Sequence, residues 1–320
     1  MDIIISICCI TYNHEKYIRD TLEGILCQKF DKPYEIIIHD DASSDGTVEI
    51  LREYQGKYPD KIRLLLEEEN QYKYGKKMFY TDIAVAKGKY IALCEGDDYW
   101  CDENKLKKQY DFIEKNSEIT YLCHATYMNI YGKKKMKELR AGECDHVIEL
   151  REVLERGKMY PTASLFLKRD SFRNIPKFYL EAPVEDEPIK LLCLSQGKGF
   201  YINELMCVYR KNHPGSWNNI IKHQKKKRLD HHNDKKKMYQ EFDKYTKGIY
   251  RNSIEQAITL ENFNIIMTNR TFKELRSSKY KLIIDNLNFK SKVRVYIAAY
   301  IPKVYKTVLN IYKVCTRKGD

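Results

Sequence analysis

The sequence predicts an α/β protein in which a mixed, mainly parallel sheet is covered by helices on both faces, followed by a basic helical tail. Short apolar segments alternate with segments of helical spacing over residues 3–115, which is typical of strand–helix–strand units. Two of the apolar segments end abruptly in acidic residues. The chain has 320 residues with 43% hydrophobic and 12% aromatic content, enough for one large core or two smaller ones.

The predicted strands are short, apolar and rich in branched residues. Because they have no polar face, we expect them in a sheet that is buried on both sides. They cover Ile3–Ile10, Glu35–His39, Ile62–Leu66 and Tyr90–Cys94.

The segments between these strands place apolar residues at helical spacing. They cover Lys16–Gln28, Thr47–Tyr58, residues 75–87 and, after the last strand, about Asn104–Lys115. Gly88 is expected to end the third helix. Strands joined by such crossovers run parallel, with right-handed connections. Their carboxyl ends therefore share one edge of the sheet, where open α/β sheets bind ligands.

Acidic residues follow two of the strands at this edge. They are Glu95, Asp97 and Asp98 after the strand at Tyr90, and Asp40 and Asp41 after the strand at Glu35. Neighbouring carboxylates repel each other and are costly to bury unless a cation or hydrogen bonds compensate. A divalent ion, Mg²⁺ or Mn²⁺, that carries substrate phosphates would do so. The alternative is a solvent-facing turn in which Asp97 and Asp98 cap the next helix, but the convergence of two acidic strand ends favours a binding crevice.

Three segments in this order resemble family-2 glycosyltransferases, which have a GT-A nucleotide-sugar-binding fold. They are SICCITYNHEKYIRDTLEGILCQ, EIIIHDDASSDGT and AKGKYIALCEGDDYW. The resemblance covers about residues 3–217 at the family's spacings. It implies a GT-A catalytic domain over residues 1–218, a nucleotide-sugar donor, Mn²⁺ or Mg²⁺ as cofactor, and transfer with inversion at the anomeric carbon.

The resemblance also implies a role for each matching position of the first three segments. Thr11, Tyr12 and Asp41 would hold the nucleoside. Asp97 would lie against the ribose or the metal, and Asp98 would be the principal metal ligand of a DXD-like motif.

This sequence departs from the family pattern at two positions. Glu95 stands where the first Asp of the motif is commoner, which leaves the ligand set open, and Ile10 replaces the usual Pro before Thr-Tyr-Asn. Lys76 and Lys77 would supplement the ion at the pyrophosphate, or else lie on a solvated helix face.

The segment Ala-Pro-Val-Glu-Asp-Glu-Pro precedes a helix that runs through residues 189–195. In the resembled family this loop carries the catalytic base, and Asp186 is the matching position. Its task would be to take the proton from an acceptor hydroxyl. The plain alternative is an acid that caps the helix. Glu185 is the nearest competitor for the role, and Glu187, before Pro188, is expected to face solvent.

The segment YRKNHPGSW closes the predicted catalytic domain and resembles the family's terminal YRxH segment, which folds back toward the diphosphate. His213 would be a phosphate donor or a metal ligand, Arg210 a phosphate contact, and Trp217 a lid over the sugar. A single histidine in such a position is often only structural.

The tail, residues 219–320, differs sharply in charge from the rest. It holds 24 Lys and Arg against 9 Asp and Glu, a net charge of +15, which leaves −3 for residues 1–218. Residues 219–251 predict a solvated basic helix, in which His231 and His232 have no recognisable set of metal-ligand partners.

Lys292–Cys315 is amphipathic at helical spacing, and Pro302 should divide it. Its apolar side is expected to carry Val293, Ile297, Tyr300, Val304, Val308, Ile311 and Cys315. A tyrosine-rich face beside lysines suits the interface of an anionic membrane. The alternative is a helix that packs on the catalytic domain. No nucleic-acid motif accompanies the basic residues, so no nucleic acid is expected.

The sequence therefore predicts a metal-dependent inverting glycosyltransferase that acts on a glycan or lipid-linked glycan acceptor, in surface polysaccharide synthesis. The alternatives are a nucleotidyltransferase or pyrophosphorylase, and a non-catalytic membrane scaffold with a degenerate pocket. No stretch of 18 uncharged apolar residues occurs, and MDIIISICCI lacks the basic start and cleavage site of a signal peptide. A cytoplasmic protein at the inner face of the membrane, with reduced cysteines, is expected.

Overall fold

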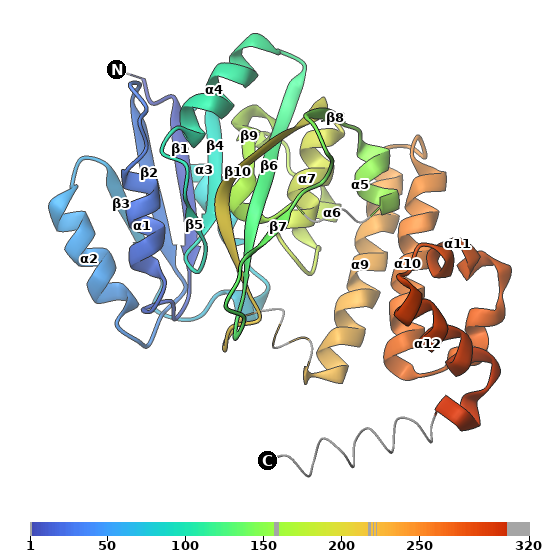
Figure 1. Ribbon diagram of the computed structural model, residues 1–320. Helices are drawn as coiled ribbons and strands as arrows, with labels where there is room; N and C mark the ends of the chain where they lie inside the picture. Colours follow the sequence, from blue (N-terminus) through green and yellow to red (C-terminus); the bar gives the residue numbers. More distant parts are fainter. Residues whose placement is uncertain (1, 157–159, 217–218, 220, 222, 306–320) are drawn as a thin grey trace.

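The computed structural model describes residues 2–156, 160–216, 219, 221 and 223–305 (Figure 1). The position of Trp217 and residues 306–315 of the predicted amphipathic segment lie outside the described residues. Within them, one twisted sheet forms the centre of the molecule. Helices cover both of its faces, and a group of helices from the end of the chain lies beside it.

The strands of the described part form a mixed sheet in the order β3-β2-β1-β4-β9-β6-β10-β5, with β7 on β6 and β8 on β10. Their bounds are β1 Ile5–Thr11, β2 Tyr34–Asp40, β3 Ile62–Leu66, β4 Tyr90–Glu95, β5 Tyr99–Trp100, β6 Ile119–Ile130, β7 Lys137–Leu139, β8 His146–Ile148, β9 Phe166–Lys168 and β10 Lys198–Lys211. The four predicted strands are confirmed as β1, β2, β3 and β4, which pair in parallel.

The pairing register places the polar strand ends at one edge. In the β1–β2 pair Thr11 lies opposite Asp40, and in the β1–β4 pair Ile10 lies opposite Glu95. Neighbouring strands are about 4.8 Å apart, so the ends of β2 and β4 flank the end of β1 across about 10 Å. The predicted convergence of the two acidic turns on one edge is confirmed.

The helices of the described part form two layers and a C-terminal group. Their bounds are α1 Ile18–Leu26, α2 Thr47–Lys57, α3 Met78–Val85, α4 Lys105–Lys115, α5 Leu150–Arg156, α6 Lys177–Leu180, α7 Asp186–Leu194, α9 Lys225–Tyr245, α10 Arg251–Asn269, α11 Lys281–Asp285 and α12 Phe289–Tyr300. Short 3₁₀ turns lie at Tyr72–Tyr74, Thr162–Ser164, Arg169–Phe172, Phe272–Arg276 and Ser278–Tyr280.

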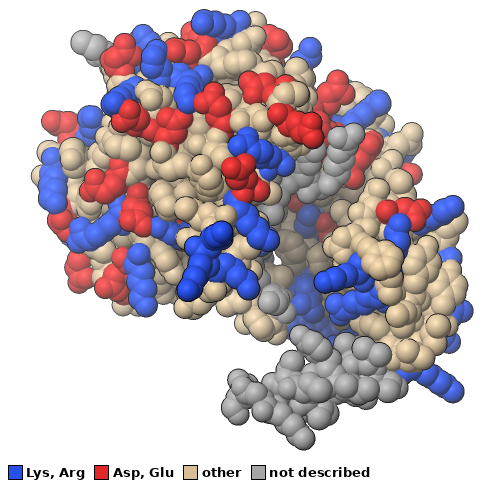
Figure 2. All heavy atoms as spheres, viewed as in Figure 1, with Lys and Arg blue, Asp and Glu red and all other residues tan. Residues whose placement is uncertain are grey.

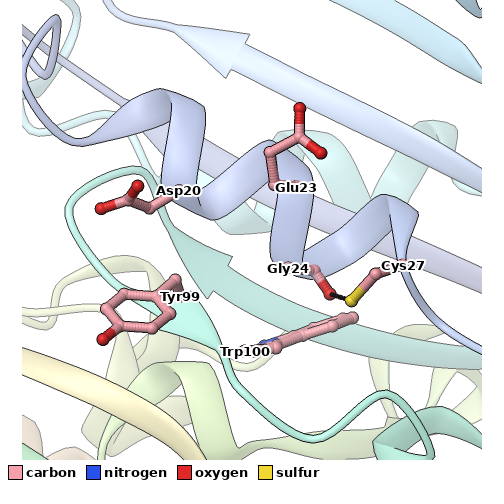
Figure 3. Close-up of a pocket in the computed structure, with 6 residues that line it drawn as sticks. All are labelled: Asp20, Glu23, Gly24, Cys27, Tyr99 and Trp100. Carbon is pink, nitrogen blue, oxygen red and sulfur yellow. Dashed lines mark hydrogen bonds between the residues drawn. The ribbon is translucent and has the colours of Figure 1, made fainter.

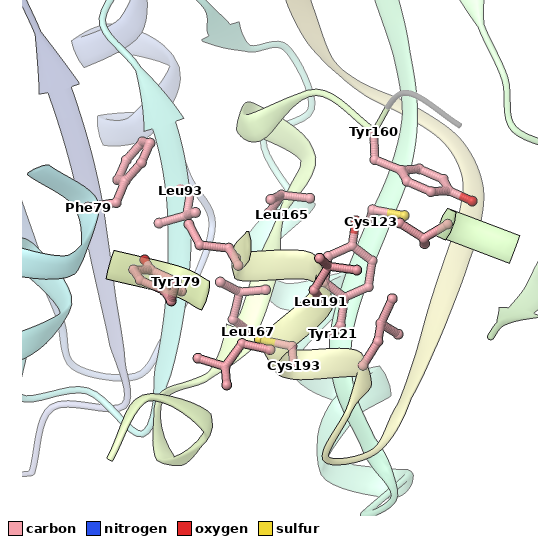
Figure 4. Close-up of a cluster of buried hydrophobic side chains, with 14 of the residues drawn as sticks. Phe79, Leu93, Tyr121, Cys123, Tyr160, Leu165, Leu167, Tyr179, Leu191 and Cys193 are labelled. Carbon is pink, nitrogen blue, oxygen red and sulfur yellow. The ribbon is translucent and has the colours of Figure 1, made fainter. Parts of the chain in front are cut away.

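Side chains alternate along each strand between two hydrophobic cores. In β1, Ile5, Ile7 and Cys9 face the core shared with α1, α2 and α4, whereas Cys8 faces the core shared with α3, α6 and α7. Figure 4 shows this second core, where Phe79 and Leu93 lie near Tyr179 and the side chains of β6, β9 and α7. Both faces of the sheet are therefore buried, as the apolar strands predicted.

The second core continues into the C-terminal extension, residues 219–320. Met238, Tyr239 and Phe242 of α9 and Ile254 and Ala257 of α10 belong to it and are buried. The prediction of a solvated helix over residues 219–251 is therefore wrong for this part of α9, which packs on α6 (Figure 1). From Phe263 onward the extension forms a third core of its own.

The predicted amphipathic segment packs in part by the expected face. α12 ends before Pro302, as predicted, and a new helical turn begins there. Val295, Ala298 and Ala299 are buried in the third core, and Ile297 of the predicted apolar face packs against it. Val293, Tyr300 and Val304 of that face are exposed, so they do not pack on the catalytic domain, and binding of this face to a membrane stays a prediction.

The helices and the cysteines bear on two further predictions. Within the described residues no helix is both long enough and apolar enough to cross a bilayer. The cysteines of the same part are all free thiols, and those on the strands and on α7 are buried.

Candidate active site

The acidic turn after β4 is held tightly against the end of β1. Gly96 N–H donates to Ile10 O at 2.8 Å, and Asp98 N–H donates to Glu95 O at 2.9 Å. A Cβ on Gly96 would lie 2.6 Å from Thr11 Oγ1 and 2.9 Å from His14 Nδ1, so a side chain has no room there. The glycine between the acids is therefore a packing requirement of the turn.

Asp98 is buried with one carboxylate oxygen unsatisfied. The residue is 1% exposed, Oδ1 accepts the backbone N–H of Arg210 at 2.8 Å, and Oδ2 has no hydrogen-bond partner among the described residues. Burial, followed by the charges of Asp97 and Glu95, raises the pKa of Asp98 well above its ordinary value. A buried oxygen without a hydrogen-bond partner costs free energy. Binding of a ligand to this oxygen would remove that cost.

Asp97 is paired with His213. Asp97 Oδ2 lies 2.7 Å from His213 Nε2, and His213 Nδ1 lies 3.0 Å from Pro214 O. Because both ring nitrogens face acceptors, this geometry suits the doubly protonated ring. Burial opposes this charge, but the hydrogen bond to Asp97 raises the pKa of His213 above its ordinary value. The predicted proximity of His213 to the acidic motif is confirmed; its role as ligand or phosphate donor remains a proposal.

The side chain of Arg210 connects the acidic turn to neighbouring elements. Its guanidinium donates to Asp97 O at 2.9 Å, forms an ion pair with Asp20 of α1, and lies over the rings of Tyr17 and Tyr99 at 5.2 and 4.6 Å. These contacts tie the acidic turn to α1 and β10. A phosphate contact, as the resemblance implies, would require Arg210 to share its donors with the ligand.

Glu95 and Asp186 lie close enough for their charges to interact. Burial, followed by the charges of Asp97 and Asp186, raises the pKa of Glu95 to about 8. The pKa of Tyr209 on β10 is also raised, first by burial and then by the charges of Glu95, Asp98, Asp97 and Asp186. The charges of four acids from two distant parts of the chain therefore act on one tyrosine of β10.

Asp186 is the first residue of α7 and remains accessible. Its side chain is 42% exposed, and Oδ2 accepts from Lys190 Nζ at 2.7 Å. Burial alone would raise the pKa of Asp186, but the nearby Lys190 and Lys235 hold it below its ordinary value. The carboxylate is therefore ionised at neutral pH, which a general base requires.

Glu185, the competitor for this role, has another task. Its two oxygens accept the backbone N–H groups of Met78 and Phe79 at 2.9 and 2.8 Å, so it caps α3 from outside that helix. Lys77 donates to Ala182 O on the same loop. Lys76, the predicted pyrophosphate contact, is exposed in the loop just before α3. Glu187 does not face solvent as predicted: Lys235 and Tyr239 of α9 contact its carboxylate.

The predicted nucleoside residues lie at the ends of β1 and β2. Asp41 is buried, and its oxygens accept the backbone N–H groups of Gln71 at 2.5 Å and Tyr72 at 3.2 Å. Thr11 is buried beside His14, with Thr11 Oγ1 3.1 Å from His14 Nδ1. Tyr12, the residue after β1, is exposed. Asp41 thus holds a loop of the crevice, and its part in nucleoside binding stays a prediction.

The chemistry of the donors suits a hard divalent cation. Three carboxylates and one imidazole are the ligands that Mn²⁺ prefers, and Mg²⁺ accepts the carboxylates. A bound cation would give Oδ2 of Asp98 a partner and would lower the raised pKa of Glu95. Within the described residues, however, no three His, Cys, Asp or Glu side chains converge as a ready ligand set. The residue types fit a metal ion. To bind it, the Asp97 carboxylate would have to give up its hydrogen bond to His213 or use its other oxygen.

Three residues near the site, His14, Tyr17 and Lys190, were not predicted from the sequence. His14 is half-buried between Thr11 and the acidic turn, and its removal from water lowers its pKa. Tyr17 lies against the His213 ring, with centroids 4.8 Å apart. Lys190 is only 5% exposed, in its ion pair with Asp186. A lysine four residues after an acid is a recognisable helical pair, whereas the contacts of His14 and Tyr17 come from the fold.

A surface cavity of about 410 Å³ lies beside this site, between α1 and β5 (Figure 3). Its lining consists of Asp20, Glu23, Gly24, Cys27, Tyr99 and Trp100. Arg210 separates it from the acidic turn, because its guanidinium pairs with Asp20 and stacks on Tyr99. Among the described residues, none of those predicted as site residues lines this cavity.

Comparison with known proteins gives a family and a fold. The family model described as Glycosyl transferase family 2 matches residues 6–175, more than half of the chain. An uncharacterized protein of Mycobacterium tuberculosis (strain ATCC 25618 / H37Rv) is 32% identical over 222 residues, which are 69% of this chain and 62% of that protein. The chain thus spans less than two thirds of this relative.

Two further similarities are informative. The UDP-Glc:alpha-D-GlcNAc-diphosphoundecaprenol beta-1,3-glucosyltransferase of Escherichia coli is 28% identical over 213 residues, 67% of this chain and 79% of that one. The structure of S. aureus TarS 1–349 in complex with UDP-GlcNAc superposes with a TM-score of 0.60 at 16% identity, over 97% of this chain and 92% of that one.

The mannosyltransferase PcManGT of Pyrobaculum calidifontis, in complex with GDP-Man and Mn²⁺, superposes with a TM-score of 0.58 at 14% identity, over 98% of this chain and 88% of that one. At such identities the likeness establishes the fold, and the predicted GT-A architecture is confirmed. Taken with the family match and the ordered acidic motifs at the sheet edge, it follows that the chain is a member of glycosyl transferase family 2.

Proposed function

We propose that this chain transfers a sugar from a nucleotide-sugar donor to a hydroxyl of a glycan or lipid-linked glycan acceptor, with inversion at the anomeric carbon. The observation that carries the proposal is the buried Oδ2 of Asp98, which has no partner among the described residues, in the acidic turn at the carboxyl edge of the sheet. Asp186 lies near enough for its charge to raise the pKa of Glu95 in the same turn. The relatives whose names describe a sugar transfer make the same assignment plausible for this chain. A role in surface polysaccharide synthesis is part of the proposal.

A divalent ion, Mn²⁺ or Mg²⁺, belongs to this proposal. Asp98 and Asp97 would hold it, with Glu95 or His213 as a further ligand. When bound, it would offset the charge of the diphosphate leaving group. Thr11, Tyr12 and Asp41 would hold the nucleoside against the ends of β1 and β2. Lys76 and Arg210 would contact the phosphates, and Trp217 would cover the sugar.

Asp186 would perform the proton transfer. The acceptor oxygen forms a bond to the anomeric carbon while the bond from that carbon to the diphosphate oxygen breaks, and the nucleoside diphosphate leaves with the electron pair. The acceptor proton passes to the carboxylate of Asp186. Its ion pair with Lys190 at 2.7 Å supports this role, because it keeps the carboxylate charged and fixes its direction.

The test is the release of nucleoside diphosphate by the full chain with a panel of nucleotide sugars and Mn²⁺. We expect Asp186→Asn to lower transfer by about 10²- to 10⁴-fold and to leave thermal stabilisation by the donor unchanged. Asp170→Asn, at an exposed acid paired with Arg173, is the matched control.

The products separate the rival functions. Release of inorganic pyrophosphate would indicate a nucleotidyltransferase or pyrophosphorylase, and donor binding without turnover would indicate a scaffold. Full activity of Asp186→Asn would remove the base assignment.

The exposed face of α12 supports binding to an anionic membrane. Phe289, Val293, Tyr296 and Tyr300 recur at helical spacing and are exposed, Phe289 to 80%. A cavity of about 450 Å³ nearby is lined mainly by cations, namely Lys225, Arg228, Arg270 and Arg294 with Met267, Thr268 and Tyr305. Figure 2 shows basic side chains along this part of the surface. Apolar rings beside cations suit the headgroup region of anionic lipid, and the cytoplasmic leaflet is the proposed location.

Flotation of the full chain with vesicles tests this surface. We expect retention on vesicles of phosphatidylcholine with phosphatidylglycerol, and loss of most of it in Phe289→Ser/Tyr296→Ser. The control is Tyr131→Ser/Met136→Ser, at exposed apolar residues next to the β6–β7 turn. Equal flotation of the two double variants would overturn the assignment.

A further inference from the structure

We propose that α9 of the extension positions the catalytic base. Lys235 and Tyr239 hold Glu187 and, through it, the first turn of α7, so that the neighbouring Asp186 is presented to the acceptor. Lys235 is then a positioning residue rather than part of a separable basic tail. This inference rests on the proposed role of Asp186.

The contacts form a closed polar network. Lys235 Nζ lies 2.7 Å from Glu187 Oε2 and 2.7 Å from Glu261 Oε1, so one ammonium joins α7 to α10. Tyr239 OH donates to the other oxygen of Glu187. His232 Nδ1 lies 2.6 Å from Glu261 Oε2. The network therefore joins α7 to α9 and α10, two later helices that follow each other in the sequence.

The network is shielded from water. The side chains of Lys235, Glu187 and Glu261 are 16%, 19% and 4% exposed. In such a place an ion pair adds little net stability, but removal of one partner leaves an uncompensated buried charge. The paired charges therefore constrain geometry, and the loss of one of them should cost more than the replacement of all of them together. The apolar packing of Met238 and Phe242 in the second core already holds α9 in place, so the network is not needed merely to attach the helix.

The position of Glu187 explains why this geometry matters for the base. Asp186 and Glu187 are consecutive in the first turn of α7, and consecutive helical residues point about 100° apart. One carboxylate therefore faces the crevice while the other faces α9. A rotation of this turn would carry Asp186 away from the acceptor, and a displacement of about 1 Å is enough to lose on the order of 100-fold in rate.

The charge of Lys235 also acts on Asp186. The titratable groups near Asp186 are Lys190 within α7, Lys235 from α9, Glu95 from β4 and Tyr209 from β10. The two cations lower the pKa of Asp186. Loss of Lys235 would therefore move the acid limb of the pH–rate profile to higher pH, which a purely structural role would not do.

The test compares Lys235→Met with Lys237→Met in the full chain. Lys237 lies on the same helix and pairs with Asp234 at the surface, so it controls for the loss of one positive charge. For Lys235→Met we expect kcat to fall about 10- to 100-fold, the KM for the donor to stay within about twofold, and the acid limb to shift upward. Lys235→Arg, which can still bridge two carboxylates, should recover most of the rate.

A second variant guards against a folding defect. Lys235→Met/Glu187→Gln/Glu261→Gln removes the buried charges together and should melt near the wild type. If it folds and kcat remains low, the positioning role is supported. If it folds and has the wild-type kcat and pH profile, the inference is overturned. An inactive wild type would instead refute the proposed function itself, so the two failures are distinguishable.

Discussion

Two buried acidic clusters in this protein have opposite electrostatic character. In the body, Glu95 and Asp98 lie beside Asp97; burial and like charge raise the pKa of Glu95 to about 8 and that of Asp98 well above its ordinary value. In the extension, burial would raise the pKa of Glu261 as well, but the hydrogen bond from His232 and the charge of Lys235 lower it to about 2.

The difference separates the cluster that we expect to bind a ligand from the one that we do not. Glu261 has an internal cation within hydrogen-bond distance, so its charge is already compensated. Asp98 has one buried oxygen without a partner among the described residues, so its charge is compensated only if something binds. Burial alone does not separate the two cases, because both acids are almost fully buried.

The largest effect is expected at Asp98. Asp98→Asn keeps an oxygen that can accept the Arg210 N–H but removes the charge, so transfer should fall by at least about 10³-fold. The melting temperature should not fall, because the lost charge was repelled by Asp97 and Glu95 and had an unsatisfied oxygen. Turnover and thermal unfolding, measured on one preparation, check both parts.

Asp111→Asn is the matched control for this substitution. Asp111 lies on the exposed face of α4 and pairs with Lys107, so neither quantity should change appreciably. A marked drop in the melting temperature of Asp98→Asn would mean that Asp98 is a structural group, and the contrast between the clusters would disappear.

The next effect is the pH dependence of stability at Glu261. Its pKa is lowered in the folded state, so its contribution to the free energy of unfolding is present above about pH 4.5 and is lost as the pH falls toward about 2. The shift corresponds to about 3 kcal/mol in all, of which about 2 kcal/mol should be lost by pH 3. Urea unfolding at pH 6 and pH 3 should show wild type and Glu261→Gln converging by this amount.

Glu255→Gln provides the comparison on the same helix. Glu255 is exposed on α10, so its substitution should leave the wild-type pH dependence in place. Parallel stability curves for wild type and Glu261→Gln would show that the Lys235 network does not stabilise the charged form of Glu261.

The sequence predicted the body well because its signals are local. Apolar runs with branched residues located the four parallel strands, and the order of strands and helices placed Asp41 and Glu95 at one edge. The start of α3 was expected at about residue 75 but lies at Met78. Its first amides are capped by Glu185, more than 100 residues later in the chain, and no local pattern contains that partner.

The extension was harder to predict for the same physical reason. Its helices and the break at Pro302 follow from spacing, but the partner of each face does not. Glu187 was expected in solvent, yet its partners lie 48 and 52 residues further along the chain, in a helix rich in lysine. In α12, small residues such as Ala298 and Ala299 allow close packing, whereas the larger rings of Tyr296 and Tyr300 remain exposed.

The smallest effect compares two glycines and tests how the acidic turn is held. Gly96→Ala would place a Cβ 2.6 Å from Thr11 Oγ1, so the turn or β1 must shift, and stability should fall by about 1–3 kcal/mol. Gly56→Ala, on the exposed face of α2 with no atom within 4 Å of the new Cβ, should instead stabilise the protein by up to about 1 kcal/mol. Donor-induced thermal stabilisation should weaken only for Gly96→Ala, because the shift moves Asp97 and Asp98. If Gly96→Ala were as stable as the wild type and bound donor equally well, backbone packing would not be what fixes these acids, and the cluster of the body would owe its geometry to ion pairs, as the cluster of the extension does.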